Sequence, residues 1–169
     1  RCVPGEQFPA SRCNAKLVGA RYFTQGWGGD RALKALLPHE FLSARDYDGH
    51  GTHAAATAAG NAGVAATGAA AVYGTVSGVA PRARIAAYKA LWHVEGAGIA
   101  NGFTSDVVAA IDQAVADGVD VINYSVAGTR TDFADPVQLA FLAAADAGVF
   151  VAASAGNTGP FTGTVAHPG

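Results

Sequence analysis

Charge of either sign is scarce in this sequence, and positive charge is never clustered. Only 14% of the 169 residues are charged, the net charge is −2 and the pI is near 6.2. Nucleic-acid binding requires a basic patch, so the composition gives it no support. Glycine (22 residues) and alanine are abundant instead, which is typical of helices packed closely against a sheet.

Methionine and long apolar runs are also missing. Because the chain contains no methionine, we expect it to be a processed or truncated piece of a longer protein. The longest weakly polar stretch, residues 63–80, is interrupted by glycine and threonine and contains no leucine or isoleucine. We therefore expect no membrane span, and a single domain large enough to bury a core.

Cysteine occurs only twice, at Cys2 and Cys13 in a turn-rich segment. In an oxidising compartment the two thiols would close a short loop, whereas in the cytosol they would stay free. We predict the disulfide, and with it a secreted protein.

The second half of the chain alternates between strand and helix patterns. Residues 1–15, 24–45 and 61–80 look irregular, because glycine and proline interrupt them. Strands are predicted at 16–23, 83–91, 119–126 and 149–154, and helices at 104–117 and 136–147.

Particular residues support the predicted helices and the last strand. The helix at 104–117 has an apolar face, and Thr104, Ser105 or Asp106 could cap it. The strand at 149–154 is apolar throughout, as expected for burial on both faces. The apolar face of the helix consists of Val107, Ala110, Ile111, Ala114 and Val115.

Strand–helix alternation with short connections predicts an α/β fold with a mostly parallel sheet. Ligands of such sheets bind at the carboxyl ends of the strands. Polar residues gather at two of these ends, 123–128 and 154–159. We therefore expect a site there.

Asp46-Tyr-Asp-Gly-His50-Gly-Thr-His53 brings two imidazoles and two carboxylates together just before a helix that extends to Ala59 and stops at Gly60. This places His50 at the helix N-terminus, where the helix dipole favours the neutral imidazole that a general base needs. By itself the motif leaves three interpretations open: a structural role, a metal site formed by His50, His53 and Asp46, and base catalysis.

Three further stretches follow this motif in a characteristic order: Gly78-Val-Ala-Pro-Arg-Ala-Arg-Ile-Ala-Ala-Tyr-Lys89, Val119-Asp-Val-Ile-Asn-Tyr-Ser125 and Ala153-Ser-Ala-Gly-Asn-Thr-Gly159. With the histidine motif they resemble the subtilisin-like serine peptidases. The segments around Cys2 and Cys13 look like the secreted branch best known from plants, which also has bacterial members. The resemblance implies a three-layer subtilisin-like fold with helices on both faces of the sheet.

The resemblance also implies roles for individual residues. His50 matches the general base of the catalytic triad, and Asn157 matches the donor to the oxyanion. Ser125, Val126, Ala127 and Gly128 match the strand end along which substrate lies, although many relatives have glycine in place of Ala127. His53 matches a structural position, and Asp46 and Asp48 are expected to be turn residues.

Neither the Asp-Thr/Ser-Gly segment that carries the triad aspartate nor the Gly-Thr-Ser segment that carries the nucleophile occurs in the sequence. We therefore expect residues 1–169 to be the central part of a subtilase catalytic domain, incomplete at both ends and inactive alone. Its sheet edges and apolar faces should be open, which predicts poor solubility.

The resulting functional hypothesis is a secreted serine endopeptidase that forms an acyl-enzyme with protein or peptide substrates. No metal or other cofactor, nucleic acid or membrane is expected as a partner, and the full-length protein is expected to be a monomer. The main alternative is a subtilase-like binding protein that has lost its chemistry. A nucleotide-binding domain is disfavoured, because no Gly-x-Gly-x-x-Gly links a strand to a helix.

Overall fold

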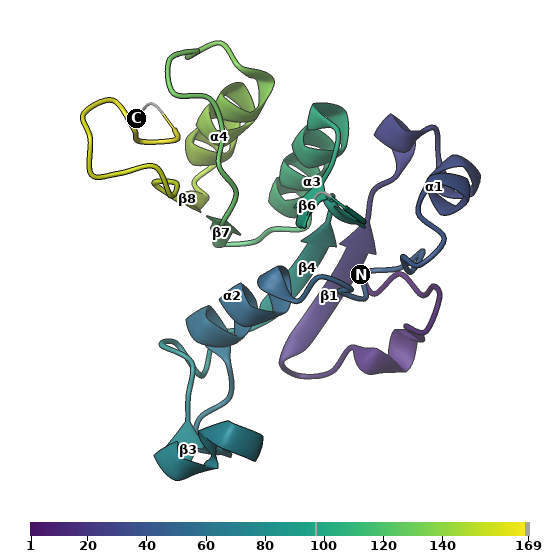
Figure 1. The fold of residues 1–169 in the computed structure, drawn as a ribbon, viewed down its shortest axis with the longest axis vertical. Coiled ribbons are helices and arrows are strands. Elements are labelled where there is room, and N and C mark those ends of the chain that lie inside the picture. The colour runs from purple at the N-terminus through teal and green to yellow at the C-terminus, as the bar shows by residue number, and fades with distance from the viewer. Residues whose placement is uncertain (97, 168–169) are drawn as a thin grey trace.

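Two pairs of parallel strands form the centre of the fold (Figure 1). The computed structural model describes residues 1–96 and 98–167. β1 (Leu17–Tyr22) pairs with β4 (Ile85–Lys89), and β7 (Val121–Tyr124) pairs with β8 (Phe150–Ala153). Within the described residues β4 and β7 do not pair with each other, so the two ladders are separate.

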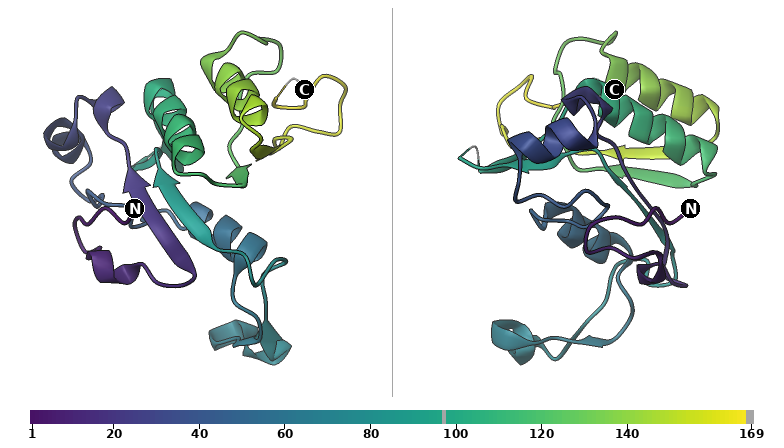
Figure 2. Two further views of the ribbon diagram at one scale, coloured as in Figure 1. Left: turned by 180° about the vertical axis from the view of Figure 1, so that it is seen from behind. Right: turned by 90° about the vertical axis from the view of Figure 1, so that its right-hand side faces the viewer.

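Helices cover these strands from two sides. α3 (Thr104–Ala116) and α4 (Pro136–Asp146) pack side by side on one side of the strands, whereas α2 (His50–Ala59) lies on the opposite side, beside β4 (Figure 1 and Figure 2). The predicted α/β class, with parallel strands and helices on both faces, is confirmed. Among the residues described, none of the helices is long and apolar enough to cross a membrane.

The regular second half of the chain matches its prediction closely. Each strand and helix from β4 to β8 that was predicted ends within two residues of the expected position. Four of the five residues on the predicted apolar face of α3 are buried, and the fifth, Val115, packs against them. The main core consists of buried residues of α3 and α4 with Ala90 and Val149: Ala90, Val107, Ala110, Ile111, Val137, Ala140, Phe141, Ala144 and Val149.

β8 is buried on one face only, so the prediction of burial on both faces was wrong. Phe150 is 67% exposed, and its partner on β7, Val121, is 57% exposed. Val151 and Ile122, which point to the other face, pack against the core. The continuous apolar run predicted that both faces of β8 would be covered, but the described residues cover only one. The open apolar face that the sequence analysis expected is present.

The structure contains a short helix that the sequence pattern missed. α1 (Asp30–Leu36) lies within residues 24–45, and a 3-10 turn, η2 (Gln25–Trp27), precedes it. Gly28 and Gly29 have φ angles of 86° and 89°, so they reverse the chain between these two elements. The two glycines indicated a loop, and a helix of two turns is too short to give a clear apolar period.

Two antiparallel hairpins were also missed. In the first, β2 (Val64–Ala65) and β3 (Thr75–Val76) flank a 3-10 segment, η3 (Gly68–Tyr73), and project from the body of the molecule (Figure 1). In the second, β5 (Trp92–Val94) pairs with β6 (Ile99–Asn101). Strands of two or three residues are too short to show an alternating pattern.

The caps of the two long helices differ. The N-cap position of α3 is Phe103, so the prediction that Thr104, Ser105 or Asp106 caps this helix was wrong. The carboxylate of Asp106 is instead buried and accepts a hydrogen bond from the backbone N–H of Gly26 at 2.9 Å. α4 begins as predicted at Pro136, and Asp135 accepts hydrogen bonds from the backbone N–H groups of the first turn.

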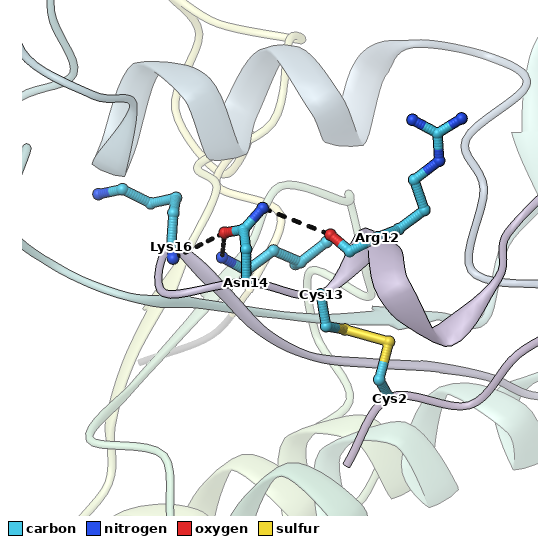
Figure 3. The surroundings of a disulfide bond; sticks show 6 residues. Cys2, Arg12, Cys13, Asn14 and Lys16 are labelled. Carbon is cyan, nitrogen blue, oxygen red and sulfur yellow. Dashed lines mark hydrogen bonds between the residues drawn. A yellow bond between two sulfur atoms is a disulfide. The ribbon is translucent and has the colours of Figure 1, made fainter.

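Cys2 and Cys13 form a disulfide, as predicted, with their Cα atoms 6.2 Å apart (Figure 3). The backbone of Cys2 forms a parallel bridge with Ala20 of β1, so the disulfide closes the loop between this segment and the start of β1. The side chain of Asn14 accepts a hydrogen bond from the backbone N–H of Lys16 at 2.8 Å and fixes the turn that enters the strand (Figure 3). A 3-10 turn, η1 (Ala10–Arg12), lies within this loop.

Candidate active site

His50 is the first residue of α2, as the sequence predicted. The preceding residue, Gly49, has a φ angle of 95°, which favours glycine and turns the chain into the helix. His50 is exposed, and the described residues form no hydrogen bond to its imidazole. Its ring is therefore open to solvent and to a partner. His53 is exposed as well, so the described residues do not bury its side chain as a structural role would require.

Two carboxylates fix the turn that carries His50. Asp46 accepts hydrogen bonds from the backbone N–H of Gly49 at 2.9 Å, and from the backbone N–H and the hydroxyl of Thr52 at 2.9 and 2.6 Å. Burial alone would raise the pKa of Asp46, but these hydrogen bonds and the charge of Lys89 lower it on balance. Asp48 accepts a hydrogen bond from the backbone N–H of His50 at 3.2 Å. Both aspartates thus bond within the turn, as expected.

A buried ion pair anchors the chain before this turn. Glu40 is 1% exposed, and its carboxylate lies 2.7 Å from Nζ of Lys89 at the end of β4. The same ammonium group donates to the carbonyl of Arg45 at 2.8 Å and lies 4.2 Å from the ring centroid of Trp92. Burial lowers the pKa of Lys89, and the attraction of Glu40 offsets part of that effect. The segment that leads to His50 is therefore held against the end of β4.

The predicted substrate segment follows directly after β7. Ser125, Val126, Ala127 and Gly128 lie beyond the last paired residue of the strand, Tyr124, and both Ala127 and Gly128 are exposed. The hydroxyl of Ser125 accepts a hydrogen bond from the Asn123 amide at 2.9 Å.

His167 is a residue at this segment that the sequence analysis did not identify. It is 9% exposed, and its Nε2 lies 2.9 Å from the carbonyl oxygen of Val126. Its Nδ1 lies 2.7 Å from Nε2 of Gln138 in α4. A Cβ at Gly128 would come within 2.4 Å of the His167 ring, so the imidazole fits only against a glycine. A single histidine distant in sequence gave no signal that could have revealed this contact.

Asn157 lies in a bend just after β8 and is exposed. Gly156 has a φ angle of 82° and turns the chain after β8, just before Asn157. The hydroxyl of Ser154 donates to the carbonyl of Val126 at 3.1 Å, and the backbone N–H of Ala166 donates to the carbonyl of Ala155 at 3.0 Å. The loop that carries Asn157 is thereby joined to the predicted substrate segment.

A hollow of about 220 Å³ lies beside the predicted substrate segment. The ends of β4 and β7 and the starts of α3 and α4 border it, as expected for a site at the carboxyl ends of parallel strands. Its lining combines apolar with polar side chains, and the adjoining strand ends suit an extended chain with a side chain inserted. The apolar residues that line it are Leu91, Ala100, Val107, Tyr124, Val126, Ala127 and Val137, and the polar ones are Asn101, Thr104, Thr129 and Asp135.

The structure thus brings the predicted residues together in two groups. Ser154, at the start of the loop of Asn157, is joined to Val126 by a hydrogen bond, whereas among the described residues no hydrogen bond connects either of them to His50. The alternative of a metal site at His50, His53 and Asp46 gains no support from the geometry. The carboxylate of Asp46 accepts hydrogen bonds from the first turn of α2. No group of three or more His, Cys, Asp or Glu side chains in residues 1–96 and 98–167 is placed to hold a metal ion.

A sequence model of the subtilase family matches residues 38–169, which include His50, the predicted substrate segment and Asn157. The chain belongs to the subtilase family. Its fold is accordingly the α/β fold of subtilisin-like proteins, represented here by part of the domain.

Several plant proteases are similar to this subtilase over nearly its whole length. The chain is 45% identical to subtilisin-like protease SBT2.2 of Arabidopsis thaliana over 94% of its residues, 46% identical to SBT2.6 over 98%, and 44% identical to SBT1.5 over 99%. It covers only 18%, 20% and 21% of those three proteins, respectively. The chain therefore spans about a fifth of the length of these relatives.

Proposed function

We propose that this chain is the central part of the catalytic domain of a serine endopeptidase, with His50 as the general base. The observation that carries the proposal is the position of His50, exposed at the first residue of α2 on a turn fixed by two aspartates. Membership of the subtilase family supports the reaction class. The nucleophilic serine and the triad aspartate would come from residues outside this sequence.

In the proposed reaction the imidazole of His50 takes the hydroxyl proton of that serine as the oxygen attacks the scissile carbonyl. The amide of Asn157 donates to the oxygen that becomes negatively charged in the tetrahedral intermediate. His50 then returns the proton to the leaving amine, and water hydrolyses the acyl-enzyme with the same base. Residues Ser125, Val126, Ala127 and Gly128 would bind the substrate backbone as an added strand.

The surroundings of the site support protein or peptide substrates. The hollow beside Val126 is lined by both polar and apolar side chains at the ends of strands, which suits an extended peptide. The disulfide between Cys2 and Cys13 supports secretion, because such bonds persist in oxidising compartments. A monomeric full-length protein remains part of the proposal.

The test is to express the full-length protein and expose it to a serine-reactive fluorophosphonate probe. We expect labelling of the wild type and its loss in His50→Ala, because the serine then has no base. Asn157→Ala should keep the label but turn over substrate roughly 10²–10³-fold more slowly. The 169-residue chain by itself should not label.

His53→Ala is the matched control, because it makes the same chemical change one helical turn away on the same exposed helix. It should label like the wild type. A folded full-length protein that never labels would refute the peptidase and favour a subtilase-like binding protein.

A further inference from the structure

The segment from His39 to Asp48, which leads to His50, meets the β5–β6 hairpin in two crossed histidine–carboxylate pairs. His93 of β5 places Nδ1 at 3.0 Å from Oδ2 of Asp48. In the opposite direction, His39 places Nδ1 at 3.4 Å from Oε1 of Glu95, which follows β5. Each segment therefore supplies one histidine and one carboxylate to the other.

Asp48 joins this pairing to His50 directly. One of its oxygens, Oδ2, faces His93. The other, Oδ1, accepts a hydrogen bond from the backbone N–H of His50 at 3.2 Å. A shift of Asp48 would therefore move the first residue of α2 with it. Asp48 therefore links the backbone of His50 to the hairpin, in addition to the hydrogen bonds that Asp46 accepts within the turn.

The hairpin is itself firmly held. The backbone N–H of His93 donates to Oε1 of the buried Glu40 at 2.6 Å, and the carbonyl of His93 lies 2.9 Å from Nε2 of His39. The ring of Tyr47 lies 4.9 Å from that of His39 and 5.3 Å from that of His93. His93 is thus a fixed point against which Asp48 is oriented.

We propose that His93 is a positioning residue for His50, acting through Asp48. This inference rests on the proposed function, in which His50 is the base. The imidazole of His93 donates to Asp48 and keeps its second oxygen directed at the backbone N–H of His50. The charged and titratable groups that face His93 are Asp48, His39 with Glu95, Tyr47 and Glu40.

The test uses the full-length protein with a peptide substrate, and the concentration of active enzyme is fixed by fluorophosphonate titration. His93→Ala should lower kcat roughly 10- to 100-fold, since a misplaced base is costly, and change KM less than about threefold. His93→Asn should restore most of kcat, because its amide can still donate to Asp48.

The active-site titration separates positioning from loss of structure. A misplaced base lowers kcat per titrated active site. A purely structural defect would instead lower the titrated concentration of active enzyme and leave kcat per active site unchanged.

Tyr88→Phe is the matched control, because it removes another hydrogen bond of similar length to a carboxylate, that of Asp117 at 2.9 Å, at the end of α3. It should leave kcat unchanged. Unchanged kcat in His93→Ala, with a labelled wild type, would overturn the inference.

Hydrogen exchange tests the contact without any need for activity. Peptides that cover residues 46–53 should exchange faster in His93→Ala and at the wild-type rate in His93→Asn and Tyr88→Phe. Equal exchange in all variants would overturn the inference, whereas a wild type that does not label would refute only the proposed function.

Discussion

The two parallel ladders are held in place by different kinds of interaction. β1 and β4 are fastened by charged groups: Arg21 of β1 pairs with Asp117 at the end of α3 at 2.7 Å, and Lys89 of β4 pairs with Glu40. β7 and β8 are fastened by apolar side chains of α3 and α4, which bury Ile111 and Phe141.

The difference shows that parallel pairing itself does not decide how a ladder is stabilised. Where helices lie directly over a ladder, as over β7 and β8, apolar burial supplies the stability. The ladder of β1 and β4 also contacts α3, but there long charged side chains reach backbone carbonyls and carboxylates. Lys16 at the start of β1 does so with three carbonyls, those of Ala59, Pro81 and Ala83, at 2.9, 2.7 and 2.6 Å. The first ladder should therefore respond to charge and pH, and the second to volume.

Lys89→Met should have the largest effect. It leaves the carboxylate of Glu40 buried without its counter-charge, so the free energy of unfolding should fall by about 3–5 kcal/mol. Urea unfolding of the full-length protein would measure the loss.

The double variant Lys89→Met/Glu40→Gln is the control for this charge effect. It should recover part of the stability, because no unpaired charge remains. If both variants are equally unstable, the pair acts through packing, and the contrast between the two ladders would be lost.

Ile111→Ala should come second, with a loss of about 3 kcal/mol in the free energy of unfolding, because Ile111 is 4% exposed in the main core and its removal leaves a cavity. This loss should be nearly the same at low and high salt. Strong salt dependence would contradict an apolar origin.

Asp117→Asn should have a smaller and pH-dependent effect. The guanidinium of Arg21, followed by the hydroxyl of Tyr88, lowers the pKa of Asp117 to about 2. A carboxylate with a lowered pKa stabilises the fold above its ordinary pKa and loses that contribution as the pH falls through the lowered value.

The wild type should therefore exceed Asp117→Asn by less than about 1 kcal/mol at neutral pH, because the pair is partly solvated. The difference should shrink below about pH 4 and vanish near pH 2. Urea unfolding at a series of pH values would measure it. A constant difference over that range would rule out the ionised carboxylate as its source.

Leu142→Gln should have the smallest effect, within about 0.5 kcal/mol, because Leu142 of α4 is 67% exposed on the described chain. The measurement should be made both on residues 1–169 and on the full-length protein. A large loss in the full-length protein alone would reveal that another segment covers this face of α4.

Much of the fold could be predicted because its second half repeats clear patterns. The 3.6-residue period around Ile111, the start of α4 at Pro136 and the glycines after both helices act within a few residues, and the structure follows them. The one-sided burial of Phe150 could not be predicted in this way, because an apolar strand has the same sequence whether one or both of its faces are covered.

The candidate site likewise has one part that could be predicted from the sequence and one part that could not. The position of His50 at the start of a helix follows from Gly49 and the alanine-rich segment after it. Its fixation by His93, 43 positions away in the printed sequence, involves two segments that show no common pattern. The same is true of His167, which contacts Val126 across 41 positions.

The order of the regular elements, the start of α2 at His50 and the resemblance to the subtilases could all be read from neighbouring residues and short motifs. The folded chain was needed to show which carboxylate holds which cation, how β8 is covered and that the turn of His50 is bonded to the β5–β6 hairpin. Hydrogen bonds and ion pairs form wherever side chains meet, and the meeting of distant segments depends on how the whole chain packs.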